Sequence, residues 1–170
     1  AGMELVRASL SSSQKFLTME LRPYQEKVNK DKKEEEIKPD KSFELELWTW
    51  DEYEVPTLQT RSRYSHPQYS KYIYDIASQK LTEVAPGYAD LLEPDRAEEI
   101  HYVLYTDETP YRSQKDWLNE MPFDIYSVNV HTGEKQLVGR SYRTRPRWSM
   151  NGKWAVMYDP VAQVWNKFDG

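Results

Sequence analysis

The sequence predicts an all-β fold, and its composition and pattern both support this prediction. Aromatic residues make up 14% of the 170 residues, including 13 Tyr and 6 Trp, although the hydrophobic fraction is only 38%. Large rings with a polar tip suit sheets that have one wet face, and they argue against global disorder. Many short runs alternate between apolar and polar residues, and turn residues such as Asn-Gly and Thr-Gly separate several of them.

Composition excludes several classes of protein. The formal net charge of -5 provides no basic footprint for nucleic acid. No apolar window reaches the length of about 18 residues that a membrane span requires. The absence of Cys excludes disulfides, thiolate metal sites and cysteine nucleophiles. Residues 1–4 lack the basic and apolar regions of a signal peptide, so none is expected at this end.

Residues 1–41 differ from the rest and are expected to form an N-terminal strand and a charged connector. Phe16 to Leu21 alternates like a short strand, which Pro23 interrupts. Residues 29–41 read NKDKKEEEIKPDK, with charges of both signs and Ile37 as their one apolar residue. A run of this kind is typical of a solvated connector.

From residue 42 the hydrophobic period is two, which predicts strands joined by turns. Helix formers in residues 87–99 predict a short helix cut by Pro94, and one helical turn is expected at Gln114 to Glu120. The expected strands are Phe43–Trp50, Lys71–Ile76, Lys80–Val84, Ile100–Thr106, Asp124–Val130, Lys135–Val138, Arg145–Met150, Lys153–Tyr158 and Gln163–Trp165.

An internal repeat refines the fold class. Residues 72–84 (YIYDIASQKLTEV) align with residues 126–138 (YSVNVHTGEKQLV) at a shift of 54, and at this shift Ile100 falls on Trp154. Four-stranded units with a period of roughly 40–50 residues are typical of β-propeller blades, which stack through shared apolar faces. We therefore expect an incomplete β-propeller over residues 42–170, with about two and a half to three blades of four-stranded antiparallel sheet. The blades are expected at approximately residues 42–85, 98–139 and 145–170.

The blade template assigns a position to each strand. Residues 124–138 become the third and fourth strands of one blade, and residues 145–168 the first three of the next. Phe43–Trp50 becomes the second strand of the blade that ends with residues 71–84, and Phe16–Leu21 could fill the fourth place beside Trp165. Closed propellers need roughly 4–8 blades. Open blade edges therefore predict a homodimer or strand exchange.

Two segments resemble a known family. Residues 145–159 (RPRWSMNGKWAVMYD) and 124–138 (DIYSVNVHTGEKQLV) resemble propeller strands of TolB-like proteins and of prolyl-oligopeptidase-like (dipeptidyl-peptidase-type) serine peptidases. Residues 47–52 (LWTWDE) are similar to large bacterial members of that peptidase family. The resemblance covers residues 43–168. It implies a propeller that controls access of peptide substrates to a separate α/β-hydrolase domain, in a periplasmic or otherwise exported parent protein.

The hydrolase half of that family is missing from the sequence. None of the six glycines forms the Gly-x-Ser-x-Gly elbow, so the chain alone is expected to be inactive, with no catalytic residue. Its expected partners are the remaining blades and the hydrolase domain of a longer parent chain. Two alternatives stay open. One is a TolB-like propeller that binds a protein or ligand without an enzymatic domain, and the other is a self-contained β-sandwich or barrel of unknown binding role.

Two basic clusters are the candidate binding residues. One would lie on a single face of a strand and grip an anion, although pairing with neighbouring acids is the structural alternative. The other lies in an expected loop, where contact with a partner is common. The candidates are Arg143, Arg145 and Arg147 in the first cluster, and Arg61, Arg63, Tyr64 and His66 in the second.

The remaining polar and aromatic residues favour structural roles. No nucleophile or convergent carboxylates mark the three histidines, so no catalytic triad, metal or cofactor is expected. Glu98 and Glu99 do not match the setting of the paired acids in dipeptidyl-peptidase-type relatives. Tryptophans on expected strands favour packing between blades over a sugar-binding surface. These are Trp48, Trp50, Trp148, Trp154 and Trp165.

Overall fold

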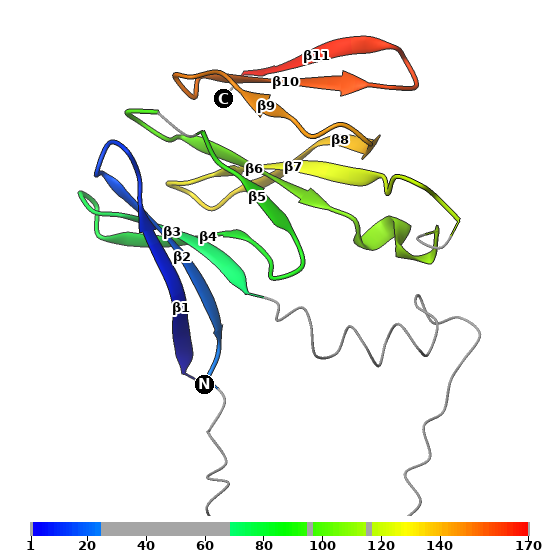
Figure 1. The fold of residues 1–170 in the computed structure, drawn as a ribbon. Helices are drawn as coiled ribbons and strands as arrows, with labels where there is room; N and C mark the ends of the chain where they lie inside the picture. Colours follow the sequence, from blue (N-terminus) through cyan, green and yellow to red (C-terminus); the bar gives the residue numbers. More distant parts are fainter. Residues whose placement is uncertain (1, 25–68, 95–96, 115–116, 170) are drawn as a thin grey trace, which may run out of the picture.

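The computed structural model describes residues 2–24, 69–94, 97–114 and 117–169. In this part of the chain the fold is all-β, as predicted, and its strands form three antiparallel sheets of four, four and three strands. Figure 1 shows the sheets following one another in chain order, with the second between the first and the third. No helix of the described residues combines the length and apolar character needed to cross a membrane.

Each sheet is an antiparallel meander whose strands follow one another within the part of the chain that the structure describes. Sheet 1 consists of β1 (Met3–Leu10), β2 (Phe16–Pro23), β3 (Ser70–Asp75) and β4 (Lys80–Ala85). Sheet 2 consists of β5 (Asp90–Leu92), β6 (Tyr102–Asp107), β7 (Phe123–Asn129) and β8 (Lys135–Tyr142), with a short 3-10 helix (Thr109–Gln114) between β6 and β7. Sheet 3 consists of β9 (Arg147–Trp148), β10 (Trp154–Asp159) and β11 (Val164–Asp169).

Strands β6 and β7 show how sheet 2 packs against both neighbours. Val103 of β6 and Val128 of β7 belong to the core shared with sheet 1, which we call the first contact. Leu104 of β6 and Ile125 of β7 belong to the core shared with sheet 3, which we call the second contact. Successive side chains of a strand point to opposite faces, so neighbouring residues such as Val103 and Leu104 place apolar side chains on both faces of sheet 2.

The 54-residue repeat coincides with equal positions in the sheets. Strands β3 and β4 align with β7 and β8, which are the third and fourth strands of sheets 1 and 2. Strand β6 aligns with β10, and each is the second strand of its sheet. Residues 124–138 thus contribute to the third and fourth strands of sheet 2, and residues 145–168 to the three strands of sheet 3.

The second strand of sheet 1 differs from the prediction. Strand β2, rather than Phe43–Trp50, pairs with β3, and it does not lie beside β11. Sheet 1 thus takes two strands from residues 1–41, the segment expected to form one N-terminal strand and a charged connector. Phe16, at the start of β2, is 5% exposed in the first contact, and burying a ring of this size stabilises the pairing. Phe43–Trp50 lies outside the described residues.

One of the two expected helical segments also differs. Asp90–Leu92 forms strand β5 instead of a helix over 87–99, because Leu91 and Leu92 pack against the first and second cores respectively. Tertiary packing outweighs the helix propensity of this short segment. The 3-10 helix at Thr109–Gln114 was not predicted, and the predicted turn begins where it ends: the Gln114 carbonyl accepts from the Trp117 amide at 3.0 Å and from the Leu118 amide at 3.1 Å.

Candidate functional site

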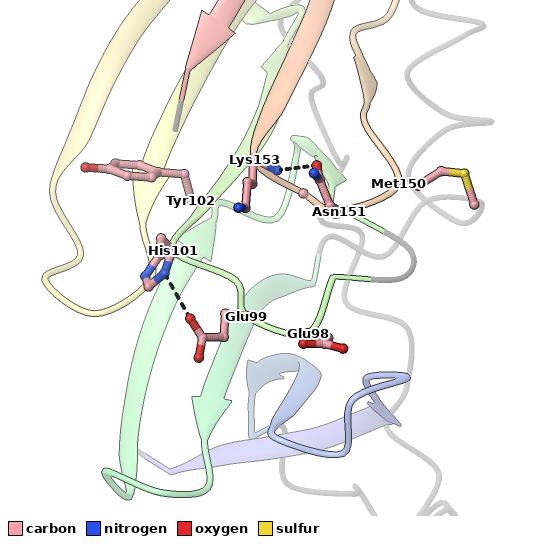
Figure 2. Close-up of a pocket in the computed structure, with 8 residues that line it drawn as sticks. Glu98, Glu99, His101, Tyr102, Met150, Asn151 and Lys153 are labelled. Atoms are coloured by element: carbon pink, nitrogen blue, oxygen red, sulfur yellow. Dashed lines mark hydrogen bonds and ion pairs between the residues drawn. The ribbon is translucent and has the colours of Figure 1, made fainter.

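One pocket of about 800 Å³ opens between sheets 2 and 3, where the β5–β6 loop meets the β9–β10 turn. In Figure 2, Glu98 and Glu99 lie on the loop, and Asn151 and Lys153 lie across from them on the turn. We call it the inter-sheet pocket. Its lining residues are Glu98, Glu99, His101, Tyr102, Met150, Asn151, Gly152 and Lys153.

The Asn151-Gly152 turn builds one wall of this pocket. Gly152 has a φ of 68°, which glycine adopts at little cost, and its amide donates to the Ser149 carbonyl at 3.0 Å. A Cβ on Gly152 would lie 2.6 Å from the Cβ of Ala97. Asn151 Oδ1 accepts from the Lys153 amide at 3.2 Å, which closes the turn. The turn therefore packs directly on the β5–β6 loop because residue 152 lacks a side chain.

The acidic wall of the pocket is solvated. Glu99 lies 3.5 Å from His101 Nε2 through one oxygen and 3.7 Å from Lys15 Nζ through the other. Its side chain is 66% exposed, so these ion pairs stabilise the fold little. An acidic wall facing Lys153 can bind a polar or cationic group. Within the described residues, no cluster of His and carboxylate side chains has the number of ligands that a metal ion needs.

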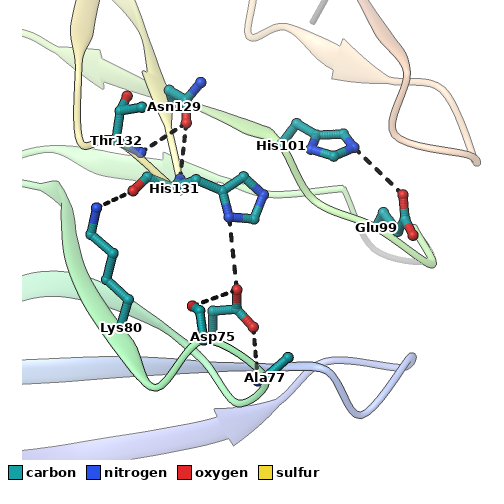
Figure 3. Close-up of polar contacts among 9 residues, drawn as sticks. Asp75, Ala77, Lys80, Glu99, His101, Asn129, His131 and Thr132 are labelled. Atoms are coloured by element: carbon teal, nitrogen blue, oxygen red, sulfur yellow. Dashed lines mark hydrogen bonds and ion pairs between the residues drawn. The ribbon is translucent and has the colours of Figure 1, made fainter.

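A second polar cluster lies at the edge of the first contact, and Figure 3 shows it together with His101, which also lines the inter-sheet pocket. His131 in the β7–β8 turn lies 3.7 Å from Asp75 Oδ2 at the end of β3, and its ring is centred 5.5 Å from that of His101. The Ser78 hydroxyl donates to Asp75 at 2.8 Å. This bond lowers the pKa of Asp75, although burial opposes the shift; the Ala77 amide and His131 contribute further lowering.

The other end of sheet 2 holds two buried carboxylates in register. Asp107 of β6 and Asp124 of β7 lie opposite each other and are 9% and 6% exposed. Asp107 accepts from the Thr109 amide at 2.8 Å, and Asp124 accepts from the Tyr111 hydroxyl at 2.5 Å. Burial and this hydrogen bond raise the pKa of Tyr111. These contacts hold the segment between β6 and β7 against the sheet.

The arginine cluster of the C-terminal third is not carried by one strand. Arg145 pairs with Asp90 at 2.5 Å, which is the structural alternative anticipated for it. Arg147 lies in β9 opposite Val156, whereas residues 143–146 have no regular secondary structure. All three arginines are exposed.

The second cluster, Arg61, Arg63, Tyr64 and His66, lies outside the described residues, as do Trp48 and Trp50. Trp148 packs in the second contact, where its indole N–H donates to the Leu92 carbonyl at 2.9 Å, as expected for packing between sheets. Trp154 and Trp165 are exposed.

Sequence reasoning did not find the inter-sheet pocket. It marked the Asn-Gly turn and Glu98-Glu99 separately, but their approach depends on how two sheets pack. Comparison with known proteins adds no function: no protein-family model matches the sequence, and no curated protein matches it significantly.

Proposed function

We propose that the chain is part of a β-propeller and serves as the non-catalytic propeller region of a prolyl-oligopeptidase-like serine peptidase. The observation that carries this proposal is the succession of the sheets. Three meanders, consecutive in the chain, pack face to face in the same order, and the repeated residues occupy equal strand positions. Radial stacking of small antiparallel sheets is the building principle of propellers.

In this proposal the region gates or supports access of peptide substrates to an α/β-hydrolase domain. The catalytic serine would lie in that domain, because the present sequence contains no Gly-x-Ser-x-Gly elbow. The remaining blades and the hydrolase domain of the parent chain would be its partners. The link to the peptidase depends on the resemblance of residues 124–138 and 145–159.

The test is to read the open reading frame beyond residue 170 and to purify its whole product. We expect a Gly-x-Ser-x-Gly motif several hundred residues downstream and labelling of that serine by a fluorophosphonate probe. Replacing the elbow serine by alanine should abolish labelling. A reading frame without the motif, whose product is not labelled, would contradict the peptidase assignment.

A TolB-like binding module without a hydrolase domain is the second candidate, and the inter-sheet pocket favours it. The acids on its β5–β6 wall predict binding of a cationic peptide. Titrating the chain with trilysine should shift the amide NMR signals of Glu99, Asn151 and Lys153. The double variant Glu98→Gln/Glu99→Gln should lose the response, and unchanged signals in the original chain would argue against this candidate.

A further inference from the structure

Sheet 3 has an apolar face that no described residue covers. Ala155 and Met157 of β10 face sheet 2, so Trp154, Val156 and Tyr158 point the other way. Trp165 of β11 lies opposite Tyr158 in register, with ring centroids 5.3 Å apart. Trp165 is 67% exposed. We call these four side chains the outer face of sheet 3.

Sheet 1 has a corresponding face on its far side. Ile73 and Thr82 are buried toward sheet 2, so their neighbours Tyr72, Tyr74 and Leu81 point away from it. The register adds further apolar residues from β1 and β2, and Leu81 is 45% exposed. The outer face of sheet 1 comprises Leu5, Ala8, Leu10, Leu17, Met19, Leu21, Tyr72, Tyr74 and Leu81. Exposed apolar surfaces of this extent typically mark interaction sites.

The repeat relates these two faces to the contacts inside the chain. Tyr126 packs in the first contact, on the face of sheet 2 that meets sheet 1, and its repeat partner Tyr72 lies on the outer face of sheet 1. Tyr102 meets Phe168 across the second contact at 6.2 Å, and its repeat partner Val156 lies on the outer face of sheet 3. The outer face of sheet 3 therefore corresponds to the face of sheet 2 that packs on the next sheet in the chain. The outer face of sheet 1 corresponds to the face of sheet 2 that packs on the sheet before it.

We propose that the outer face of sheet 3 packs on the outer face of sheet 1 of a second copy, and reciprocally, so that two copies close a ring of six sheets. This inference rests on the proposed propeller architecture and concerns the 170-residue chain, in which the second copy takes the place that the remaining blades would hold in a longer parent chain. When two different faces form a contact, each added copy leaves the same pair of faces free until the copies close a ring. Six sheets fall within the range of roughly 4–8 blades of closed propellers. The contact continues the order already present within the chain, which favours a second copy as the occupant.

The side chains of the two faces are complementary. The rigid rings on sheet 3 would pack against leucines and Met19 on sheet 1. Flexible side chains such as Met can adapt their shape to the flat surface of a ring. Arg147 and Lys167 flank Val156 on sheet 3, with Lys167 paired to Asp169 at 2.6 Å. Glu83 lies beside Tyr72 on sheet 1. The excess positive charge of one face can therefore meet the carboxylate of the other.

Two charge insertions test this contact by sedimentation velocity on the 170-residue chain. The original chain should be a dimer, and Trp165→Glu or Leu81→Glu should each raise the dissociation constant by about 30-fold or more. An equimolar mixture of the two variants should regain part of the dimer, since one of its two contacts keeps both original side chains. Val161→Glu, at a residue 86% exposed in the β10–β11 turn, is the matched control and should remain dimeric.

The outcomes that overturn the proposal are specific. A monomeric original chain, open-ended oligomers, or a variant that stays fully dimeric while the other dissociates would each contradict reciprocal packing of two unlike faces. Circular dichroism checks that both variants keep their strands. Because the chain has no Cys, Trp165→Cys and Leu81→Cys can be mixed under oxidation, and covalent dimers containing one of each are expected. A monomeric original chain would leave the peptidase proposal intact. A reading frame without the Gly-x-Ser-x-Gly motif would leave the dimer proposal intact.

Discussion

The first and second contacts join sheets by the same face-to-face plan but use different side chains. The first contact is built from small aliphatic residues such as Ile73, Val84 and Val103, with tyrosines among them and histidines at one rim. The second contact is built from Leu104, Met157 and aromatic rings. Its rings are also fixed by hydrogen bonds, including Asn166 Nδ2 to the Tyr142 hydroxyl at 2.9 Å.

This difference indicates that the two contacts respond to different perturbations. Two of the groups whose pKa values are shifted, Tyr105 and Asp75, lie in or beside the first contact. A pH change should therefore act on the first contact, whereas changes of volume should act on both. Two contacts with the same arrangement of sheets can thus differ in their response to pH, because that response depends on the side chains that each contact contains.

The largest effect is expected from cavities in the two cores. Ile73→Ala in the first contact and Ile125→Ala in the second each remove a side chain that is 1% or less exposed. Each should lower the free energy of unfolding by about 2–5 kcal/mol, measured by urea denaturation. Ile76→Ala, at a residue 45% exposed, is the control and should change it by less than about 0.5 kcal/mol. A single transition that shifts in both variants would indicate that the sheets unfold together. An Ile125→Ala loss within the control range would contradict the buried second core.

The sequence predicted the positions of the strands better than their assembly into sheets. Period-two alternation identified strands such as β10, because a half-buried strand needs it locally, and a continuous β-prone run identified β6, which is buried on both faces. Local pattern could not decide whether Phe16–Leu21 or Phe43–Trp50 pairs with β3, since both alternate and pairing depends on distant burial. The inter-sheet pocket was not predictable for the same reason. Its walls come from a loop and a turn that only sheet packing brings together.

Two glycines offer a finer comparison of the contacts. Gly133 has a φ of 81°, and a Cβ there would lie 3.4 Å from Thr82 across the first contact. Gly152, with a φ of 68°, leaves only 2.6 Å to the Ala97 Cβ. Gly133→Ala should cost about 1–2 kcal/mol from left-handed backbone strain, and Gly152→Ala should cost more because a steric clash is added. Thermal unfolding of both variants checks the order, and a larger cost at Gly133 would contradict it.

Alkaline pH should weaken the first contact through Tyr105. Burial, followed by the neighbouring Tyr126, raises the pKa of Tyr105 to about 12, and the two rings stack at 5.0 Å. The fold favours the neutral phenol, so its contribution is complete below pH 10 and is lost as pH rises toward 12. Urea denaturation between these pH values should show falling stability. The slope should be shallower in Tyr105→Phe, and an unchanged slope would exclude Tyr105 as its source.

The smallest effect is expected at the acidic end of the pH range, from Asp75. Its carboxylate accepts from the Ser78 hydroxyl and the Ala77 amide and lies beside His131, which together hold its pKa below 3.8. The contribution to stability is therefore present above pH 3.8 and is lost as pH falls through the lowered pKa of the folded state. Asp75→Asn should flatten the acid limb of the profile of stability against pH. Asp159→Asn is the control, because the Asp159 carboxylate also caps a strand-end turn by accepting from the Val161 amide.

Since His131 links Asp75 to sheet 2, Asp75→Asn should also increase hydrogen exchange at the β7–β8 turn and leave the β9–β10 turn unchanged. Equal changes in both turns would mean that the polar rim does not belong to the first contact alone.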